Sequence, residues 1–388
     1  MPSESPPSRA HIDAVELTRD LIRRPSVTPA DAGAMAIVEE TLRNLGFACR
    51  RMKFGEIENL YARWGEQGPN LCFAGHTDVV PVGDAGAWSK DAFAAEVVDG
   101  VLIGRGSVDM KSAIAAFTAA AAEAIEAGQV RGSISFLITG DEEGVATDGT
   151  VKVVEALAAE GEHIDHCVVG EPTSAETFGD MVKVGRRGSI NADIVVEGVQ
   201  GHVAYPHRAA NPVPVLVRLL SALQSRKLDD GYPEFQPSNL EVTMIEAPNT
   251  ATNVIPGVAR ARLNIRFNPN HTGRQLADWF DIEAWRAQGD FKGKITVTSS
   301  ISGEAFLTER GHFTDLVAAA VADVTGAPPE LSTSGGTSDA RFIRALCPVI
   351  EVGLVGKTMH QVDERAPVDE IRRLQQVYAR IIARYFES

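Results

Sequence analysis

An apolar run that ends in three consecutive acids is the strongest constraint on the fold of this chain. Residues 134–139 (ISFLIT) are followed by Gly140 and then by Asp141, Glu142 and Glu143. A short, β-rich apolar run bounded by glycine is typical of a buried strand in a parallel sheet. In open α/β sheets, ligands lie beyond the carboxyl ends of such strands. Adjacent carboxylates repel one another, so their grouping favours a bound cation, although this motif alone leaves a solvated acidic turn open.

Two other predicted strands end in residues of the same kind. The run 70–74 leads into His76 and Asp78, and the run 166–170 leads into Glu171. A single His-x-Asp is more often an ordinary turn than a pair of ligands. The repetition of acids and histidine at successive strand ends is what favours a binding site.

Asp109 and His360 complete this set. Asp109 lies in a glycine-rich turn, 104–111, which opens an Ala-rich helical pattern that reaches residue 127. Capping of this helix is one interpretation of Asp109, because Asp is a preferred N-cap residue. His360 follows the predicted strand 349–354.

The residues at these ends are expected to meet at one edge of one sheet. Imidazole with carboxylate is typical of catalytic zinc, and one bridging acid lets two ions share a site with a water between them. Asp78 is placed to hold the second nitrogen of His76. Glu142 is left without a ligand role and is predicted to be the general base. The predicted metal ligands are His76, Asp109, Glu143, Glu171 and His360.

The pattern changes character from Gly188 onward. Strand and helix periodicities follow the order β-α-β-β-α-β, which is a ferredoxin-like arrangement. They occupy residues 190–196, 212–224, 240–245, 258–267, 273–287 and 292–299. We predict an α/β catalytic domain with a central, mostly parallel sheet at residues 1–187 and 302–388. An inserted ferredoxin-like α+β domain is predicted at residues 188–301.

Length, charge and cysteine usage exclude several classes of protein. With 388 residues, 44% of them hydrophobic, the chain exceeds the size at which single cores stop growing. A formal net charge of -15 argues against nucleic-acid or anionic-membrane partners. The four isolated cysteines indicate a reducing cytoplasm. Residues 1–8 are predicted to be a disordered tail, and the chain contains no apolar stretch of membrane-spanning length.

Five motifs together resemble the co-catalytic dinuclear zinc family of exopeptidases and N-deacylases. This family includes acetylornithine deacetylase, aminoacylases and glutamate carboxypeptidases. The resemblance covers almost all of residues 10–385, and its motifs are GHTDVVP (75–81), GRGSVDMK (104–111), GDEEG (140–144), GEP (170–172) and MHQVDE (359–364).

The resemblance implies two Zn²⁺ ions per chain, with Co²⁺ as an alternative in the second site. It places His76 and Glu171 on one ion and Glu143 and His360 on the other, with Asp109 as the bridge. It also implies that Asp78 orients His76 and that Glu142 is the base. This assignment agrees with the one made from the residues themselves.

Three further stretches resemble the desuccinylases of this family: 184–189 (VGRRGS), 201–207 (GHVAYPH) and 334–342 (SGGTSDARF). Some members carry Asn four residues before the late histidine, where this chain has Gly356. The implied reaction is hydrolysis of N-succinyl-LL-2,6-diaminopimelate to succinate and LL-2,6-diaminopimelate. This is a step in lysine and cell-wall precursor synthesis.

The resemblance also implies a homodimer formed through the inserted domain. His202 of one subunit would then stabilise the oxyanion in the other, while a surface loop histidine is the alternative interpretation. The substrate is acidic, so local cations are expected to bind its carboxylates. The predicted substrate-binding residues are Arg186, Arg187, Asn253, Arg266, Gly335, Gly336 and Thr337.

Other functions stay open at this point. A different N-acyl amino-acid deacylase, such as an acetylornithine deacetylase, is the main alternative, and a metallo-carboxypeptidase or dipeptidase is a weaker one. A non-catalytic metal-binding or dimerisation protein would have lost its base, but Glu142 is present.

Overall fold

The computed structural model describes residues 12–387, which form two compact units. Unit 1 comprises the described residues up to Val184, together with Thr308–Ser332 and the residues from Ser338 onward. Unit 2 comprises Gly185–Leu307 and Thr333–Thr337. The predicted tail at residues 1–8 lies outside the described residues.

The predicted inserted domain, 188–301, lies within unit 2. Two short strands extend that unit at both ends: β9 (Gly185–Arg186) pairs with β16 (Phe306–Leu307) in antiparallel register. Strands this short leave no periodicity in the sequence. The catalytic and dimerisation roles given to the two domains remain predictions.

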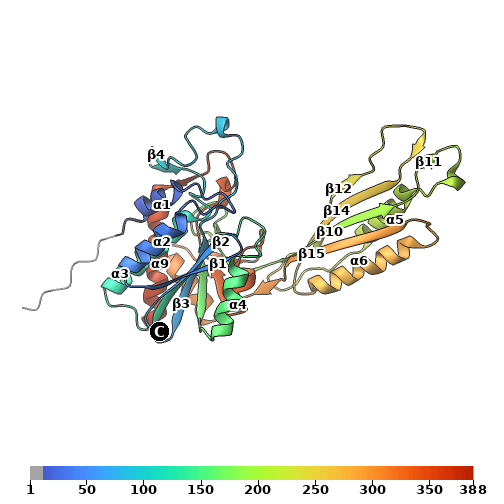
Figure 1. Cartoon of the computed structure of the whole chain (residues 1–388). Coiled ribbons are helices and arrows are strands. Elements are labelled where there is room, and N and C mark those ends of the chain that lie inside the picture. Colours follow the sequence, from blue (N-terminus) through green and yellow to red (C-terminus); the bar gives the residue numbers. More distant parts are fainter. Residues whose placement is uncertain (1–11, 388) are drawn as a thin grey trace, which may run out of the picture. The chain divides into compact units, whose positions relative to one another are not determined.

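Unit 1 is built on an eight-stranded sheet (Figure 1). Its four middle strands run parallel to one another, in the order β6-β3-β7-β18. Every residue of β3 and β6 is buried, as expected for strands covered on both faces. This confirms the predicted α/β class with a central, mostly parallel sheet. In spatial order the strands are β1 (Ala48–Phe54), β2 (Ile57–Trp64), β6 (Ser133–Thr139), β3 (Asn70–His76), β7 (His166–Val169), β18 (Val349–Glu351), β8 (Met181–Lys183) and β17 (Glu330–Ser332).

Helices cover this sheet. Helix α3 packs against α1 and α9 as well as against β3, and α4 packs against β6 and β2 (Figure 1). The Ala-rich sequence of α3 allows this close approach, and nearly all of the helix is buried. The rings of Phe73, Phe117, Phe136 and Tyr378 lie in the core, with centroids 4.5 to 5.8 Å apart in the contacting pairs. The helices of unit 1 are α1 (Ala14–Ile22), α2 (Ala34–Asn44), α3 (Lys111–Glu126), α4 (Thr150–Glu160), α7 (His312–Thr325), α8 (Ala340–Ile343) and α9 (Val368–Glu387).

A small antiparallel sheet in unit 1 was not predicted. It joins β4 (Glu96–Val98), β5 (Val101–Ile103) and β19 (Arg365–Pro367) in the order β19-β5-β4. The short helices η1 (Ala85–Ala87) and η3 (Gly356–Thr358) lie elsewhere in the same unit. The pairing of β19 with β5 ties the chain after His360 to the chain that leads into Asp109, two stretches distant in sequence.

Unit 2 has the predicted β-α-β-β-α-β order. Its antiparallel sheet has the strand order β12-β14-β10-β15. Alternate residues of β10 and β14 point into a core formed with the two helices, because side chains alternate between the faces of a sheet. The elements are β10 (Gly188–Glu197), α5 (Pro212–Ser225), β12 (Asn239–Glu246), β14 (Val258–Phe267), α6 (Gly273–Gln288) and β15 (Lys294–Gly303), with the smaller β11 (Gly201–His202), η2 (Pro206–Arg208) and β13 (Val254–Ile255).

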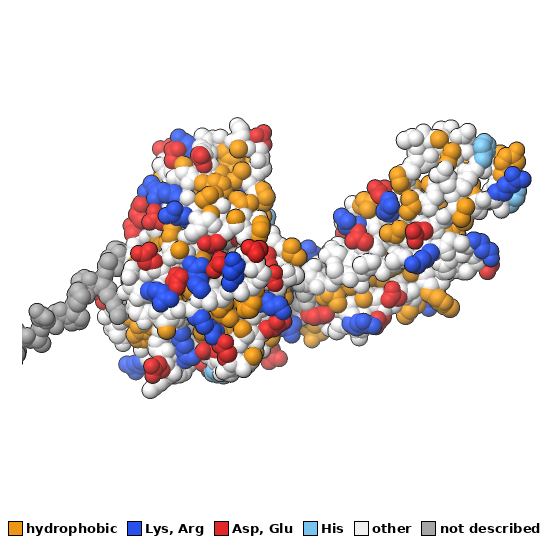
Figure 2. Space-filling view, viewed as in Figure 1, with side chains coloured by type: hydrophobic (Ala, Val, Ile, Leu, Met, Phe, Trp, Pro, Cys, Tyr) orange, Lys and Arg blue, Asp and Glu red, His pale blue; other side chains and the backbone are white. Residues whose placement is uncertain are grey.

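On the face that Figure 2 shows, Lys and Arg side chains are interspersed with Asp and Glu. This face therefore presents no extended basic stripe of the kind that follows a phosphate backbone. Among residues 12–387, no helix combines the length and the apolar character needed to cross a membrane.

Candidate metal centre

His76, the last residue of β3, has 1% of its surface exposed. Its Nδ1 lies 2.9 Å from the backbone carbonyl oxygen of Asp78, so the proton is assigned to Nδ1. Its Nε2 lies 3.1 Å from Asp109 Oδ1 and 3.6 Å from Glu171 Oε1. Burial lowers the pKa of this ring, but the hydrogen bond to Asp109 and the charges of Glu171 and Asp78 outweigh burial and raise the pKa well above its usual value.

Asp109 places one carboxylate between two imidazoles. Its Oδ1 faces His76, and its Oδ2 lies 3.3 Å from His360 Nε2. Burial raises the pKa of Asp109, but the hydrogen bonds with His360 and His76 hold it well below its usual value. Met110 is the N-cap of α3 and the cap has no side-chain hydrogen bond, so Asp109 does not cap the helix. A carboxylate that turns one oxygen toward each imidazole has the arrangement expected of a bridging ligand.

Glu143 and His360 form the second pair of facing ligands. Glu143 Oε1 lies 2.9 Å from His360 Nε2. Hydrogen bonds to Asp109 and Glu143 raise the pKa of His360 to about 10. The backbone of His360 has φ +62°, a left-handed conformation that is uncommon outside glycine. The surrounding structure must hold this conformation, which turns the ring toward the two carboxylates.

Glu171 follows Gly170 at the end of β7. Its Oε1 is buried without a hydrogen-bond partner among the described residues. Burial, Asp109 and Glu142 raise its pKa well above the usual value. A Cβ added to Gly170 would lie 2.6 Å from Ala113 Cβ, so this glycine allows the start of α3 to approach the strand end.

The carboxylate of Asp78 holds the acidic turn. It accepts the N–H of Glu142 at 3.2 Å and the N–H of Glu143 at 3.0 Å. Its Oδ1 is 3.7 Å from His76 Nδ1, so the close contact with the ring comes from the Asp78 backbone carbonyl. The Asp78 carboxylate is nevertheless within ion-pair distance of the ring, and its role in orienting His76 stays a prediction. Burial raises the pKa of Asp78 to about 6.

Asp141, to which the sequence interpretation gave no role, anchors the other side of this turn. Its Oδ2 accepts the N–H of Thr147 at 3.0 Å and of Asp148 at 3.2 Å. A buried acid that accepts hydrogen bonds from backbone N–H groups of its own loop produces no periodic pattern in the sequence. A third acid in a row beside Glu142 and Glu143 was the available hint.

The Glu142 carboxyl is adjacent to the ligands. Its oxygen belongs with the ligand atoms of His76 and Glu171 to a group that spans less than 4.8 Å, and His76, Asp109 and Glu143 form a second such group. Burial raises the pKa of Glu142 well above its usual value, and the charge of Asp339 raises it further. A carboxyl group whose pKa is raised is suited to proton transfer near neutral pH.

The donor set fits a pair of divalent cations. Several carboxylates and two imidazoles converge. The buried Glu171 Oε1 has no hydrogen-bond donor among the described residues, and a cation would supply the partner that this oxygen lacks. Carboxylate oxygens and imidazole nitrogens are the ligands of catalytic zinc centres. All five predicted metal ligands, with Asp78 and Glu142, lie together in unit 1.

The other predicted residues lie in unit 2. His202, on β11, is exposed, and its Nδ1 accepts the N–H of Ala204 at 3.0 Å. Arg186 donates to the carbonyl oxygen of Gly336 at 3.2 Å. Asn253 is exposed, and its backbone carbonyl accepts the N–H of Val203. The remaining predicted residues of this unit are Arg187, Arg266, Gly335 and Thr337.

Arg187 and Arg266 retain unused donors. Arg187 donates from Nη1 to Asn239 Oδ1 at 3.0 Å. Among the described residues, Arg187 Nε and Arg266 Nη1 are buried without a hydrogen-bond partner. Burial lowers the pKa of Arg266, and the neighbouring charge of Arg187 lowers it further. Two adjacent guanidinium groups with unused donors form a site suited to an anion.

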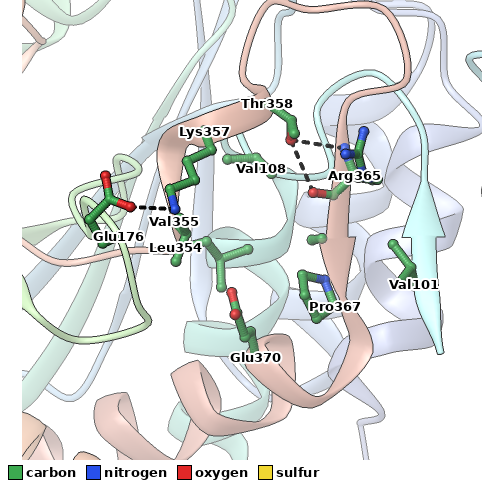
Figure 3. A pocket seen from close by; sticks show the side chains of 11 residues that line it. Val101, Val108, Glu176, Leu354, Val355, Lys357, Thr358, Arg365, Pro367 and Glu370 are labelled. Carbon is green, nitrogen blue, oxygen red and sulfur yellow. Dashed lines mark hydrogen bonds and ion pairs between the residues drawn. The ribbon is translucent and has the colours of Figure 1, made fainter.

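A separate cavity of ≈ 270 Å³ lies beside the segment that carries His360 (Figure 3). Its wall includes Val108, Leu354 and Glu370, and Lys357 pairs with Glu176 at one side, at 2.6 Å. None of the predicted ligands lines it. This cavity is therefore distinct from the metal centre.

Comparison with known proteins identifies the family. The model of peptidase family M20/M25/M40 matches residues 72–384. A protein named succinyl-diaminopimelate desuccinylase from Phenylobacterium zucineum (strain HLK1) is 84% identical, over 97% of this chain and 99% of that protein.

Solved structures share the fold at low sequence identity. An M20 family metallo-carboxypeptidase from Sulfolobus solfataricus superposes with a TM-score of 0.80 at 16% identity, over 97% of this chain and 100% of that chain. A Bacillus subtilis protein described as a dinuclear metal binding peptidase from the M20 family gives a TM-score of 0.72 at 16% identity, over 97% and 98%. The cluster around Asp109 is thus a candidate site for the metal ions on which this family of hydrolases depends. Both the full-length match and the arrangement of the strand-end ligands lead to one conclusion: the chain belongs to peptidase family M20/M25/M40 and is an amidohydrolase.

Proposed function

We propose that this chain hydrolyses the amide bond of N-succinyl-LL-2,6-diaminopimelate, releasing succinate and LL-2,6-diaminopimelate. This is a step in lysine and cell-wall precursor synthesis. The observation that carries the proposal is the convergence of two imidazoles and several carboxylates beside the raised-pKa acid Glu142. The name of the 84% identical relative supports the choice of substrate.

Two Zn²⁺ ions per chain are part of the proposal, with Co²⁺ as an alternative in the second site. His76 and Glu171 would hold one ion, and Glu143 and His360 the other. Asp109 would bridge them, because its Oδ1 faces His76 and its Oδ2 faces His360. When bound, the ions would polarise the succinyl carbonyl and lower the pKa of the attacking water.

Glu142 would act as the base. It would accept the proton of the attacking water and pass it to the nitrogen of the leaving amine. Because burial raises its pKa, this carboxyl can retain the proton between the two steps. Asp78 would keep the turn in place through its hydrogen bonds with the N–H groups of Glu142 and Glu143.

Arg187 and Arg266 are proposed to bind a carboxylate of the substrate. Their unused buried donors and adjacent charges support this role. Arg186 remains part of this proposed substrate site, and its Nη1 also donates to the carbonyl of Gly336. Asn253 and the N–H groups of Gly335, Gly336 and Thr337 remain part of the proposed substrate site.

A homodimer formed through unit 2 is also proposed, in which His202 donates a hydrogen bond to the oxyanion in the site of the other subunit. The hydrogen bond from Ala204 N–H makes Nδ1 of His202 an acceptor, so the ring proton is assigned to Nε2. An exposed Nε2–H is the donor that this role requires. A cytoplasmic location is part of the proposal, supported by the four cysteines, which the structure shows as free thiols.

One assay tests the proposed reaction. Purified protein loaded with Zn²⁺ is given N-succinyl-LL-2,6-diaminopimelate and, separately, N-acetylornithine. We expect a higher kcat/KM for the succinyl substrate and loss of activity on dialysis against a chelator. Preference for acetylornithine would identify a different N-acyl amino-acid deacylase.

A further inference from the structure

The carboxylate of Glu364 gathers donors from the loop that carries Asp109. Glu364 has 0% of its surface exposed. Its Oε1 accepts the N–H groups of Gly106, Val108 and Asp109 at 3.1, 2.9 and 3.1 Å. Its backbone carbonyl accepts the N–H of Gly104 at 2.9 Å. The late MHQVDE segment is therefore joined to the GRGSVDMK segment through a single residue.

Arg105 is the counter-ion of this carboxylate. Its side chain is 2% exposed, and its Nη1 lies 2.6 Å from Glu364 Oε2. Its Nη2 lies 3.3 Å from the carbonyl oxygen of Pro81 and 3.5 Å from that of His360. The guanidinium carbon lies 5.3 Å from the centroid of the Trp88 ring. Arg105 thus contacts two segments that each carry a candidate ligand, 75–81 and 359–364.

We propose that Glu364 and Arg105 are positioning residues. They hold the backbones of Asp109 and His360 where both side chains can bind metal, and so they set the affinity of the centre for metal. The inference rests on the metal centre of the proposed function. Glu364 reaches the backbone N–H of Asp109, and Arg105 reaches the backbone carbonyl of His360. The pair therefore acts through the ligands that it holds.

The residues that Glu364 contacts favour a role in positioning the metal ligands over a role in the stability of the fold alone. A buried ion pair is weak evidence for stability, because the cost of removing two charges from water offsets most of their attraction. Here every hydrogen bond to the Glu364 carboxylate comes from residues 105–109. His360 also needs support for its left-handed backbone. Outer-shell partners of metal ligands typically contribute about 10- to 100-fold in affinity or activity.

Glu364→Gln tests the inference. The variant keeps the side-chain size and one acceptor oxygen, but it places an amide NH₂ against the donors of Arg105. Metal-free protein is titrated with Zn²⁺ by calorimetry and with Co²⁺ by visible absorption. We expect wild-type protein to bind two ions per chain. The variant should bind at least one of them about 10- to 100-fold more weakly, with an altered Co²⁺ spectrum.

Glu162→Gln is the matched control. Glu162 pairs with Arg63 in unit 1, and their side chains are 21% and 22% exposed. Arg63 also donates to Ser133 Oγ at 2.9 Å, so the pair is embedded in its own contacts. Because it touches no candidate ligand, its loss should leave both metal affinities and the Co²⁺ spectrum unchanged.

Arg105→Lys serves where Glu364→Gln does not fold. Lysine keeps the charge but cannot span Glu364 and the two carbonyl oxygens at once. Folded Arg105→Lys should also bind metal more weakly, by a smaller factor than Glu364→Gln. Wild-type affinity for both ions in a folded variant would overturn the inference. A wild-type chain that fails to bind two ions would overturn the proposed metal centre instead.

Discussion

Glu142 and Glu143 are adjacent in the sequence, but their carboxyl groups have different surroundings. Glu143 Oε1 lies 2.9 Å from His360, whereas Glu142 is grouped with His76 and Glu171 and has its pKa raised by burial. Either carboxyl could bind a metal by its position, and the raised pKa of Glu142 is what favours proton transfer for this acid.

Glu142→Ala should keep close to two metal ions per chain and lose most turnover. General acid/base groups typically contribute about 10²- to 10⁴-fold, so kcat should fall by that factor. Metal content is measured by elemental analysis and turnover with the succinyl substrate. Glu143→Ala is the comparison and should lose one ion. A loss of turnover below about tenfold in Glu142→Ala would contradict its role as base.

Arg266→Gln should raise KM for the succinyl substrate far more than for an acetyl substrate. The reason is that Arg266 keeps a buried donor unused and lies beside the charge of Arg187. Arg262→Gln, in the same strand, is the control, because its guanidinium already pairs with Asp193 at 2.9 Å. Steady-state kinetics on both substrates measure the effect. Equal changes in KM would show that the succinyl carboxylate is bound elsewhere.

The loop between α5 and β12 is held by one half-buried acid. Asp229 accepts hydrogen bonds from the backbone N–H of Gly231 at 2.8 Å and from the side-chain N–H of Asn268 at 2.7 Å. Its Oδ2 also lies 3.0 Å from His271 Nε2. Burial raises the pKa of Asp229, but hydrogen bonds from Ser238, Gly231 and Asn268 outweigh burial and lower it to about 2. The loop is thus stabilised by the ionised form of this side chain.

Asp229→Asn should destabilise unit 2 by about 2 kcal/mol near neutral pH. Since the folded pKa lies below the unfolded one, this stabilisation is present above about pH 4 and is lost as the pH falls toward about 2. The difference between variant and wild type should therefore shrink as the pH is lowered from about 5 to about 3. Urea unfolding of metal-free protein measures it, followed by tryptophan fluorescence, to which Trp279 and Trp285 of unit 2 contribute.

Asp193→Asn is the control for this pH series. Its carboxylate forms an exposed ion pair with Arg262, with side-chain exposures of 52% and 56%, and such pairs contribute little. A constant difference between Asp229→Asn and wild type across the pH series would contradict the electrostatic role of Asp229.

The proposed dimer makes a prediction for the whole molecule. If His202 completes the site of the other subunit, a Glu142→Ala chain mixed with a His202→Ala chain forms hybrid dimers. Each hybrid contains one site with both defects and one with neither, as two-fold symmetry requires. Activity should therefore return on subunit exchange, up to one intact site per hybrid. Mass spectrometry of the mixture measures the hybrid fraction.

Each parent, incubated alone under the same conditions, is the control for subunit exchange. A mixture that contains hybrids and stays as inactive as its parents would show that His202 acts within its own chain or has no catalytic role.

The sequence by itself determined which residues are proposed as ligands of the metal centre. His76, Glu143, Glu171 and His360 each close or follow a predicted strand, and the carboxyl ends of parallel strands meet at one edge of a sheet, so the strands and the residues after them were enough to group these four. Asp109 lies instead in a glycine-rich turn before α3, and the resemblance to the zinc family was needed to assign it as the bridge. The β-α-β-β-α-β order of unit 2 could also be predicted, because its strands and helices are long enough to show their periodicity.

Only the tertiary structure decided how these side chains meet. It showed that Asp109 turns one oxygen to each imidazole and that the Asp78 carboxylate holds the N–H groups of Glu142 and Glu143. It also paired Arg105 with Glu364, 259 positions apart in the chain. These contacts depend on side-chain direction and on short strands such as β19, which packing of the whole unit selects. Periodicity reports which residues are apolar; the atoms that a buried polar group meets are set by segments distant in the chain.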